Sequence, residues 1–193
     1  MTDAPASPSG GSVEIFDDLD SLYEAAAEAL CQLVRTAIDS RGVANISLSG
    51  GSTPKRLYEI MAQQELPWSQ IHWFWGDERN VPPEDAESNQ KMVRDAMLRH
   101  AGVAEENIHA VTVQVDDPVA TARSYEQLLR KHFASDEFPT WDLVLLGMGD
   151  DAHTASLFPD SDALSESQRW FVENWVEKFD RFRYTMTAPA INS

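Results

Sequence analysis

The chain has 193 residues, of which 42% are hydrophobic, and its 32 acidic and 15 basic residues give a formal net charge of −17. This length and composition can bury one substantial core, and a single cysteine, Cys31, excludes a disulfide framework. Nucleic-acid binding depends on basic surface, so the negative charge argues against a nucleic-acid partner. No apolar run approaches the roughly 20 residues of a membrane span, which argues against a membrane partner.

Residues 1–12 are rich in Pro, Ser and Gly and contain neither a basic residue nor an apolar stretch. We therefore expect a flexible N-terminal tail rather than a signal peptide. A single domain over residues 13–193 should follow. The composition is that of a cytoplasmic protein, and we expect a monomer.

Strand and helix patterns alternate along the first half of the chain. Residues 13–16 are typical of a strand, and the next apolar residues recur at helical spacing until Gly42 stops the pattern. A strand over residues 45–48 then leads to a helix that Thr53 should cap and Pro54 should begin. A further strand is predicted at residues 71–75.

The alternation continues in the second half. After the Pro82-Pro83 loop, the sequence predicts a helix over residues 88–100, a strand over 108–115 and a helix from Pro118 to about Phe133. A strand at residues 143–146 and a short helix around Ala155 complete the central pattern. Further strands are expected at residues 170–176 and 183–187. The pattern predicts an α/β fold with a layered, mostly parallel sheet.

The most informative segment runs from Asp142 to Pro159, where an apolar run opens into a glycine turn. Gly147 and Gly149 allow a sharp turn and close approach to a ligand. Asp150, Asp151 and His153 follow at the carboxyl end of the predicted strand, where open α/β sheets bind ligands. A histidine near a carboxylate can perform general acid–base chemistry.

The same turn also fits the loose dinucleotide fingerprint G-x-G-x-x-G/A. That interpretation requires a long helix after the turn and an acidic residue about 20 residues later. Pro159 shortens the helix to roughly two turns, so nicotinamide binding is disfavoured. Considered alone, His153 is better interpreted as a surface residue that caps a short helix.

A second glycine turn follows the strand at residues 45–48. Gly50, Gly51, Ser52 and Thr53 would present backbone N–H groups and two hydroxyls at a helix N-terminus, which is a potential anion site. The segment is not a Walker A loop, so nucleoside triphosphate binding has no support. In isolation, such a turn is as often structural as it is a phosphate site.

A third segment, Asp77-Glu78-Arg79, follows the aromatic strand at residues 71–75. Arg79 could clamp a phosphate or carboxylate through two hydrogen bonds. The alternative is a structural ion pair of Arg79 with Asp77 or Glu78.

Together these segments resemble the 6-phosphogluconolactonase family from about Val13 to the last residue. The resemblance lies in Ser49-Gly-Gly-Ser-Thr-Pro54, Trp75-Gly-Asp-Glu-Arg79 and residues 147–159, supported by Glu87-Ser-Asn89 and Asn174-Trp-Val176. The first motif is shared with glucosamine-6-phosphate deaminases, whereas Asp-Glu-Arg and His-Thr-Ala-Ser-Leu-Phe-Pro are more specific to the lactonases.

The resemblance implies a Rossmann-like sheet with helices on both faces and hydrolysis of 6-phosphogluconolactone without a metal or cofactor. His153 would be the general base, and Asp151 would orient it. The turn formed by Gly50, Gly51, Ser52 and Thr53, with Asp77 and Arg79, would bind the sugar phosphate.

Other chemistries have weaker support. The five histidines show no paired metal-ligand spacing such as H-E-x-x-H, and no G-x-S-x-G elbow indicates a serine nucleophile. A deaminase or isomerase of amino-sugar phosphates stays open, as does a sugar-phosphate binder without catalytic activity.

Two departures from the family pattern bear on activity. Ala152 stands where the family usually has glycine, so a positive φ there would add strain of about 1 kcal/mol. The sequence stops at Asn192-Ser193, and we expect a C-terminal strand and helix of the family, with a phosphate-binding lysine, to be missing. The apolar segment 183–191 is then expected to form an exposed patch.

Overall fold

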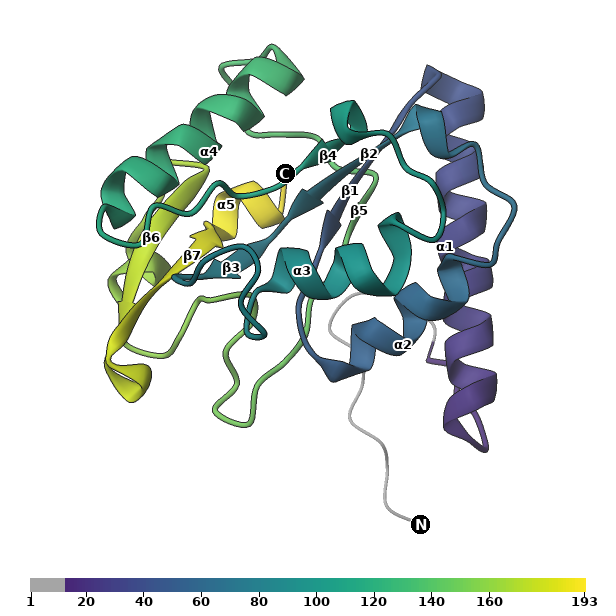
Figure 1. Ribbon diagram of the computed structural model, residues 1–193, viewed down its shortest axis with the longest axis horizontal. Helices are drawn as coiled ribbons and strands as arrows, with labels where there is room; N and C mark the ends of the chain where they lie inside the picture. Colours follow the sequence, from purple (N-terminus) through teal and green to yellow (C-terminus); the bar gives the residue numbers. More distant parts are fainter. Residues whose placement is uncertain (1–12) are drawn as a thin grey trace.

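The computed structural model describes residues 13–193 and contains two sheets flanked by helices (Figure 1). The larger sheet has four parallel strands in the order β4-β2-β1-β5. Their bounds are Ala44–Leu48 for β1, Ile71–Trp75 for β2, Ile108–His109 for β4 and Leu143–Val144 for β5. The expected α/β fold with a mostly parallel sheet is confirmed.

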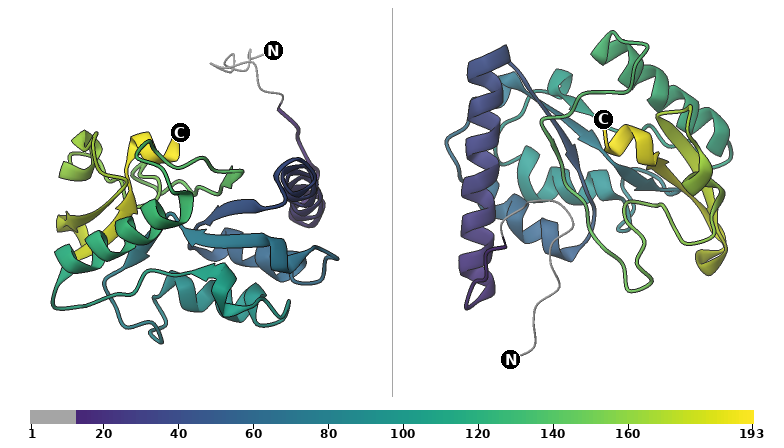
Figure 2. Two further views of the ribbon diagram at one scale, coloured as in Figure 1. Left: turned by 90° about the horizontal axis from the view of Figure 1, so that it is seen from above. Right: turned by 180° about the vertical axis from the view of Figure 1, so that it is seen from behind.

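Helices cover both faces of this sheet, as expected (Figure 2). One layer contains three helices: α1 (Leu19–Arg41), α2 (Ser52–Met61) and α3 (Asn89–Val93). Helix α2 packs against the other two. Helix α4, Pro118–Phe133, and the short α5, Ala188–Ile191, lie on the opposite side. Right-handed crossovers produce this division, because α2 and α3 lead the chain towards β4 whereas α4 leads it back to β5.

Local sequence sets the ends of the long helices. The Asp18 carboxylate accepts a 2.8 Å hydrogen bond from the Ser21 backbone N–H at the start of α1. Gly42 adopts a left-handed conformation at the end of α1, and its N–H donates to the Ile38 carbonyl. Asp117 caps α4 in the same way as Asp18, and Pro118 occupies the first turn.

The smaller sheet is antiparallel, in the order β3-β7-β6. Its strands are β3 (Asp77–Arg79), β6 (Phe171–Val176) and β7 (Arg181–Met186). Helix α4 packs against β6. Because β3 continues almost directly from β2, this sheet joins the second half of the chain to the carboxyl edge of the larger sheet.

A large cluster of buried side chains lies between these layers. Cys31 belongs to this cluster. The largest fully buried members of the cluster are aromatic: Trp73, Trp75, Trp170, Tyr58, Tyr184, Phe74 and Phe171. Within the described part of the chain, no helix is both long and apolar enough to cross a bilayer.

Several predicted elements are confirmed, and others need correction. Two predicted helices are present, one that ends before Gly42 and one that begins at Pro118. The strands predicted at residues 45–48 and 71–75 are also present. The helix predicted over residues 88–100 consists of α3 and a π-helical continuation, Arg94–Leu98. The predicted tail, residues 1–12, lies outside the described residues.

Two predicted elements do not form. Residues 13–16 form no strand with the other described residues, and Ile15 is 89% exposed. The segment around Ala155 is a tight turn closed by a bridge between Thr154 and Leu157, because Ala155 has φ of 48° and cannot continue a helix.

Other differences concern element length and burial. Strands β4 and β5 have two residues each, and Leu146 is 45% exposed, so the apolar run at residues 143–146 is not a fully buried strand. Residues 183–191 do not form an exposed patch, since β7 lies between two partner strands and residues 184–187 are buried.

Candidate active site

A cavity of about 710 Å³ opens where β1, β2 and β5 end. The seven residues expected to bind substrate or act as a base all line it; they are Gly50, Gly51, Ser52, Thr53, Asp77, Arg79 and His153. Asp151, predicted to orient the base, contacts His153 from behind. The carboxyl ends of the parallel strands therefore bring the three sequence segments together.

The first segment is a turn that ends at the N-terminus of α2. Gly51 is the N-cap, with φ of 106° that favours glycine, so the prediction of Thr53 as the cap is wrong. Within residues 13–193, no side chain caps this helix, and its first N–H groups lie at the cavity wall. The hydroxyl of Tyr58 fixes the turn, because it accepts from the Ser49 N–H at 3.0 Å and donates to the Ser49 carbonyl at 2.9 Å.

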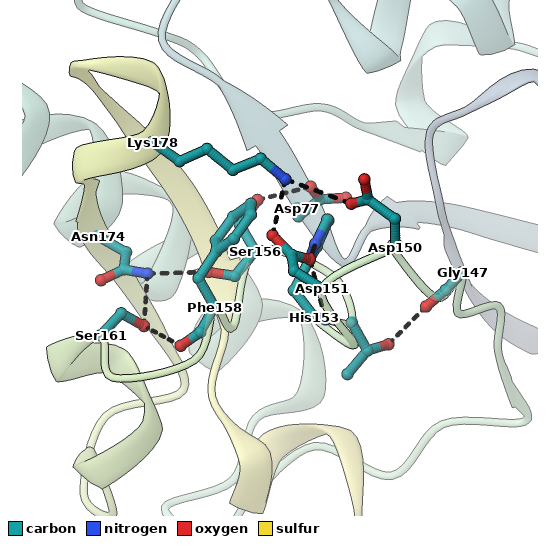
Figure 3. A network of polar contacts seen from close by, with 11 residues as sticks. Asp77, Gly147, Asp150, Asp151, His153, Ser156, Phe158, Ser161, Asn174 and Lys178 are labelled. Atoms are coloured by element: carbon teal, nitrogen blue, oxygen red, sulfur yellow. Dashed lines mark hydrogen bonds and ion pairs between the residues drawn. The ribbon is translucent and has the colours of Figure 1, made fainter.

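The second segment is a closed loop that carries the histidine (Figure 3). The Thr154 hydroxyl donates to the Gly147 carbonyl at 2.9 Å, and the Gly149 N–H donates to the His153 carbonyl at 2.8 Å. A Cβ atom on Gly149 would lie 2.2 Å from the His153 ring, so only glycine allows the loop to fold back over the imidazole.

His153 is held on two sides. Its Nδ1 pairs with the Asp151 carboxylate, and its ring stacks on Phe158 with centroids 4.0 Å apart. A proton on Nδ1 shared with Asp151 leaves Nε2 as the basic nitrogen of the neutral imidazole. This arrangement is suited to abstract a proton from a water molecule.

Asp151 is itself positioned by a residue that sequence analysis missed. Lys178 donates to Asp151 Oδ2 at 2.9 Å and approaches Asp150 Oδ1 at 3.3 Å (Figure 3). Hydrogen bonds from His153 and Lys178 hold the pKa of the Asp151 carboxyl well below its usual range. The carboxylate therefore stays ionised, as required to stabilise an imidazolium.

The third segment is β3, and its three charged side chains point alternately to opposite faces of the strand. Asp77 and Arg79 reach the cavity, whereas Glu78 points to the other side. There Glu78 is buried and accepts hydrogen bonds from the N–H groups of Asn89 and Gln90, both at 2.8 Å. Glu78 thus stabilises the start of α3 and belongs to the scaffold rather than to the cavity.

Asp77 is a buried carboxyl at the base of the cavity. It accepts from the Ser156 hydroxyl at 2.8 Å and from the Asn89 side-chain amide at 3.2 Å. Burial raises the pKa of Asp77, while the Arg79 charge and the Ser156 hydrogen bond oppose that rise. These contacts link β3 to the histidine loop and fix their relative position.

Two arginines lie side by side in the cavity wall. Pairing of β3 with β7 places Arg79 opposite Arg183, a residue that sequence analysis missed. Arg79 Nη1 donates to the Glu87 carbonyl at 2.5 Å, and among the described residues Arg79 forms no ion pair with Asp77 or Glu78. The structural ion pair considered for Arg79 is therefore not formed.

The environment of the two guanidinium groups favours an anion. Nε of Arg79 and Nε of Arg183 are buried without a hydrogen-bond partner within the described chain. Burial, reinforced by the Arg79 charge, lowers the pKa of Arg183. An anionic ligand would supply acceptors to both donors and relieve the repulsion between them.

Ala152 has φ of 65°, which confirms the conformation that makes alanine unfavourable between Asp151 and His153. Replacing Ala152 by glycine should raise the free energy of unfolding by about 1 kcal/mol, or the melting temperature by about 2–4 °C. Thermal denaturation measures this shift. The matched change Ala29→Gly, at an exposed position within α1, should lower stability by about the same amount. A loss of stability in both variants would contradict the assigned strain.

Comparison with known proteins agrees with this geometry. The chain is 46% identical over 184 residues to a 6-phosphogluconolactonase of Nostoc sp., covering 94% of this chain and 76% of the relative. It is 39% identical to the 6-phosphogluconolactonase of Mycobacterium tuberculosis, covering 93% of this chain and 76% of the relative.

Solved structures give the same result. A 6-phosphogluconolactonase from Shewanella baltica superposes with a TM-score of 0.82 at 30% identity, over 92% of this chain and 75% of that one. The 6-phosphogluconolactonase from Trypanosoma cruzi superposes with a TM-score of 0.81 at 31% identity, over 90% of this chain and 73% of that one. The sequence profile of the glucosamine-6-phosphate isomerases/6-phosphogluconolactonase family matches residues 17–193, and the chain belongs to this family.

Proposed function

We propose that this chain hydrolyses 6-phospho-D-glucono-1,5-lactone to 6-phosphogluconate, a step of the oxidative pentose phosphate pathway. The proposal rests on one observation: His153, which pairs with Asp151, lines the same cavity as Arg79 and Arg183. A base and an anion site in one cavity match a substrate that has a reactive ester and a phosphate. The names of the relatives support the same substrate.

The phosphate would bind between Arg79 and Arg183 and the N-terminus of α2. Backbone N–H groups of the turn Gly50 to Thr53 and the two hydroxyls of Ser52 and Thr53 would add donors. The net charge of −17 repels an anionic substrate. At physiological ionic strength the Debye length is about 8 Å, so salt screens the repulsion from surface charges that lie farther than this from the bound phosphate. Local cations therefore decide binding.

The reaction needs one base and one orienting carboxylate. His153 Nε2 takes a proton from water as the oxygen bonds to the lactone C1 carbon, and Asp151 stabilises the imidazolium. Collapse of the tetrahedral intermediate breaks the bond from C1 to the ring oxygen, and His153 returns the proton to that oxygen. General acid–base assistance of this kind is worth about 10²–10⁴-fold in rate.

Conversion of an amino-sugar phosphate is the alternative within the family. The lactonase reading is favoured because the relatives matched here carry the lactonase name and the motif Asp77-Glu78-Arg79 retains arginine.

The test is a pair of assays on the 193-residue chain. Freshly generated 6-phosphogluconolactone should be hydrolysed faster than its spontaneous rate, and glucosamine 6-phosphate should release no ammonia. Ammonia release without lactone hydrolysis would overturn the proposal. A chain that binds 6-phosphogluconate but accelerates neither reaction would be a sugar-phosphate binder.

We also propose that the protein works in the cytoplasm as a monomer without a nucleic-acid partner. The negative charge supports the last point, because phosphate backbones require basic surface.

A further inference from the structure

Three histidines from separate elements converge on the α4 side of the larger sheet. They are His72 in β2, His109 in β4 and His132 near the end of α4 (Figure 1). One ring nitrogen from each lies within 4.8 Å of the other two. His72 is the second residue of β2, whereas the cavity opens at the carboxyl end of that strand, and the lining residues of the cavity within the described chain include none of the three histidines.

Neighbouring groups hold the three rings in this arrangement. His72 Nδ1 and His109 Nε2 are 2.9 Å apart and share a hydrogen bond. His132 Nε2 lies 2.8 Å from the side-chain oxygen of Asn45, which can only accept, so Nδ1 of the neutral ring keeps its lone pair. The His109 ring also stacks on Phe74 with centroids 4.4 Å apart.

Imidazole nitrogens make up the ligand set of this group. All three imidazoles are half-buried, and burial lowers the pKa of each. In the described chain no carboxylate or thiol joins the group. Neutral imidazole is the ligand that Zn²⁺, Cu²⁺ and Ni²⁺ share.

We propose that His72, His109 and His132 bind one transition-metal ion of the Zn²⁺ class, with solvent in the fourth position. Tetrahedral coordination with Zn–N bonds of about 2.0–2.1 Å places ligand nitrogens about 3.3 Å apart. The His72–His109 pair needs to open by only a few tenths of an ångström. The ring that donates in this hydrogen bond moves its proton to its other nitrogen, so that both facing lone pairs are free for the metal. Asn45 then serves as the outer partner that fixes a ligand ring.

Titration of the 193-residue chain with Zn²⁺ tests this proposal. One equivalent should bind saturably, and Zn²⁺ at about a hundred times its dissociation constant should raise the melting temperature by about 5–10 °C. Co²⁺ bound in its place should give the visible spectrum of a tetrahedral nitrogen site.

Variants locate the ion. His109→Gln and His132→Gln should abolish the stoichiometric site, and Asn45→Ala should weaken it about 10–100-fold while leaving all three ligands. The matched controls are His100→Gln, at an exposed histidine outside the group, and His153→Gln, at the active site. Both should keep full affinity.

The outcomes are separable from the proposed function. Lactone hydrolysis should be unchanged in His109→Gln, because the group is remote from the cavity. Absence of saturable binding, or binding that survives both His109→Gln and His132→Gln, would overturn the metal site and leave an aromatic packing cluster. Loss of binding only in His153→Gln would place the ion in the active site instead.

Discussion

Replacing His153 by alanine should lower the catalysed rate of lactone hydrolysis by about 10²–10⁴-fold, to near the spontaneous background. Its Nδ1 is engaged by Asp151 and its ring rests on Phe158, so Nε2 is available to the cavity in one fixed orientation. The loss should fall on kcat, since the base acts in the transition state rather than in substrate binding. Initial rates corrected for spontaneous hydrolysis measure it.

Two further variants test whether the loss of rate comes from the missing base rather than from a folding defect. His100→Ala removes an exposed histidine and should leave the rate unchanged. Asp151→Asn keeps the shape of the pair but removes the charge that stabilises the imidazolium, so it should also lower kcat. A His153→Ala chain that is folded and hydrolyses the lactone at the original rate would remove His153 from the mechanism.

Replacing Arg79 by methionine should raise KM for the lactone about 10- to 150-fold. A hydrogen bond to a charged group contributes about 1.5–3 kcal/mol, which corresponds to that range of affinity. Inorganic phosphate should lose potency as a competitive inhibitor in parallel, because the lost contact is to the phosphate. Steady-state kinetics with and without phosphate measure both effects.

The control for this prediction is Arg99→Met. Arg99 is exposed, pairs with Asp95 and lies outside the cavity, so its loss should leave KM unchanged. Arg79→Lys keeps the charge but loses the planar guanidinium, so its KM for the lactone should lie between that of the original chain and that of Arg79→Met. An Arg79→Met enzyme with unchanged KM and unchanged phosphate inhibition would exclude Arg79 from phosphate binding.

Local patterns predicted much of the fold. The Asp18 and Gly42 ends of α1 and the Asp117-Pro118 start of α4 follow from capping chemistry that involves only neighbouring residues. Failures occurred where tertiary contacts decide the backbone. Residues 13–16 have strand-like alternation but no described strand beside them, and Ala155 adopts a left-handed conformation within the histidine loop.

The candidate site shows the same division. Glycine turns and charged residues at strand ends were visible in sequence, and their convergence follows from parallel strands. Arg183 and Lys178 were not predicted, because strand register and a long side-chain reach bring them to the site. The three-histidine group was missed for the same reason, since its members have no motif spacing along the chain.

Pairing of β3 with β7 has a consequence for how activity appears during folding. The hydrogen bond from the Tyr184 hydroxyl to the Asn80 side chain spans 104 residues, and the same register sets Arg79 against Arg183. Contacts of such sequence separation form slowly, because a long loop must close before they contribute. The anion site therefore cannot exist in a partly synthesised or half-refolded chain. Recovery of phosphate binding should coincide with the last refolding phase rather than with the appearance of helix.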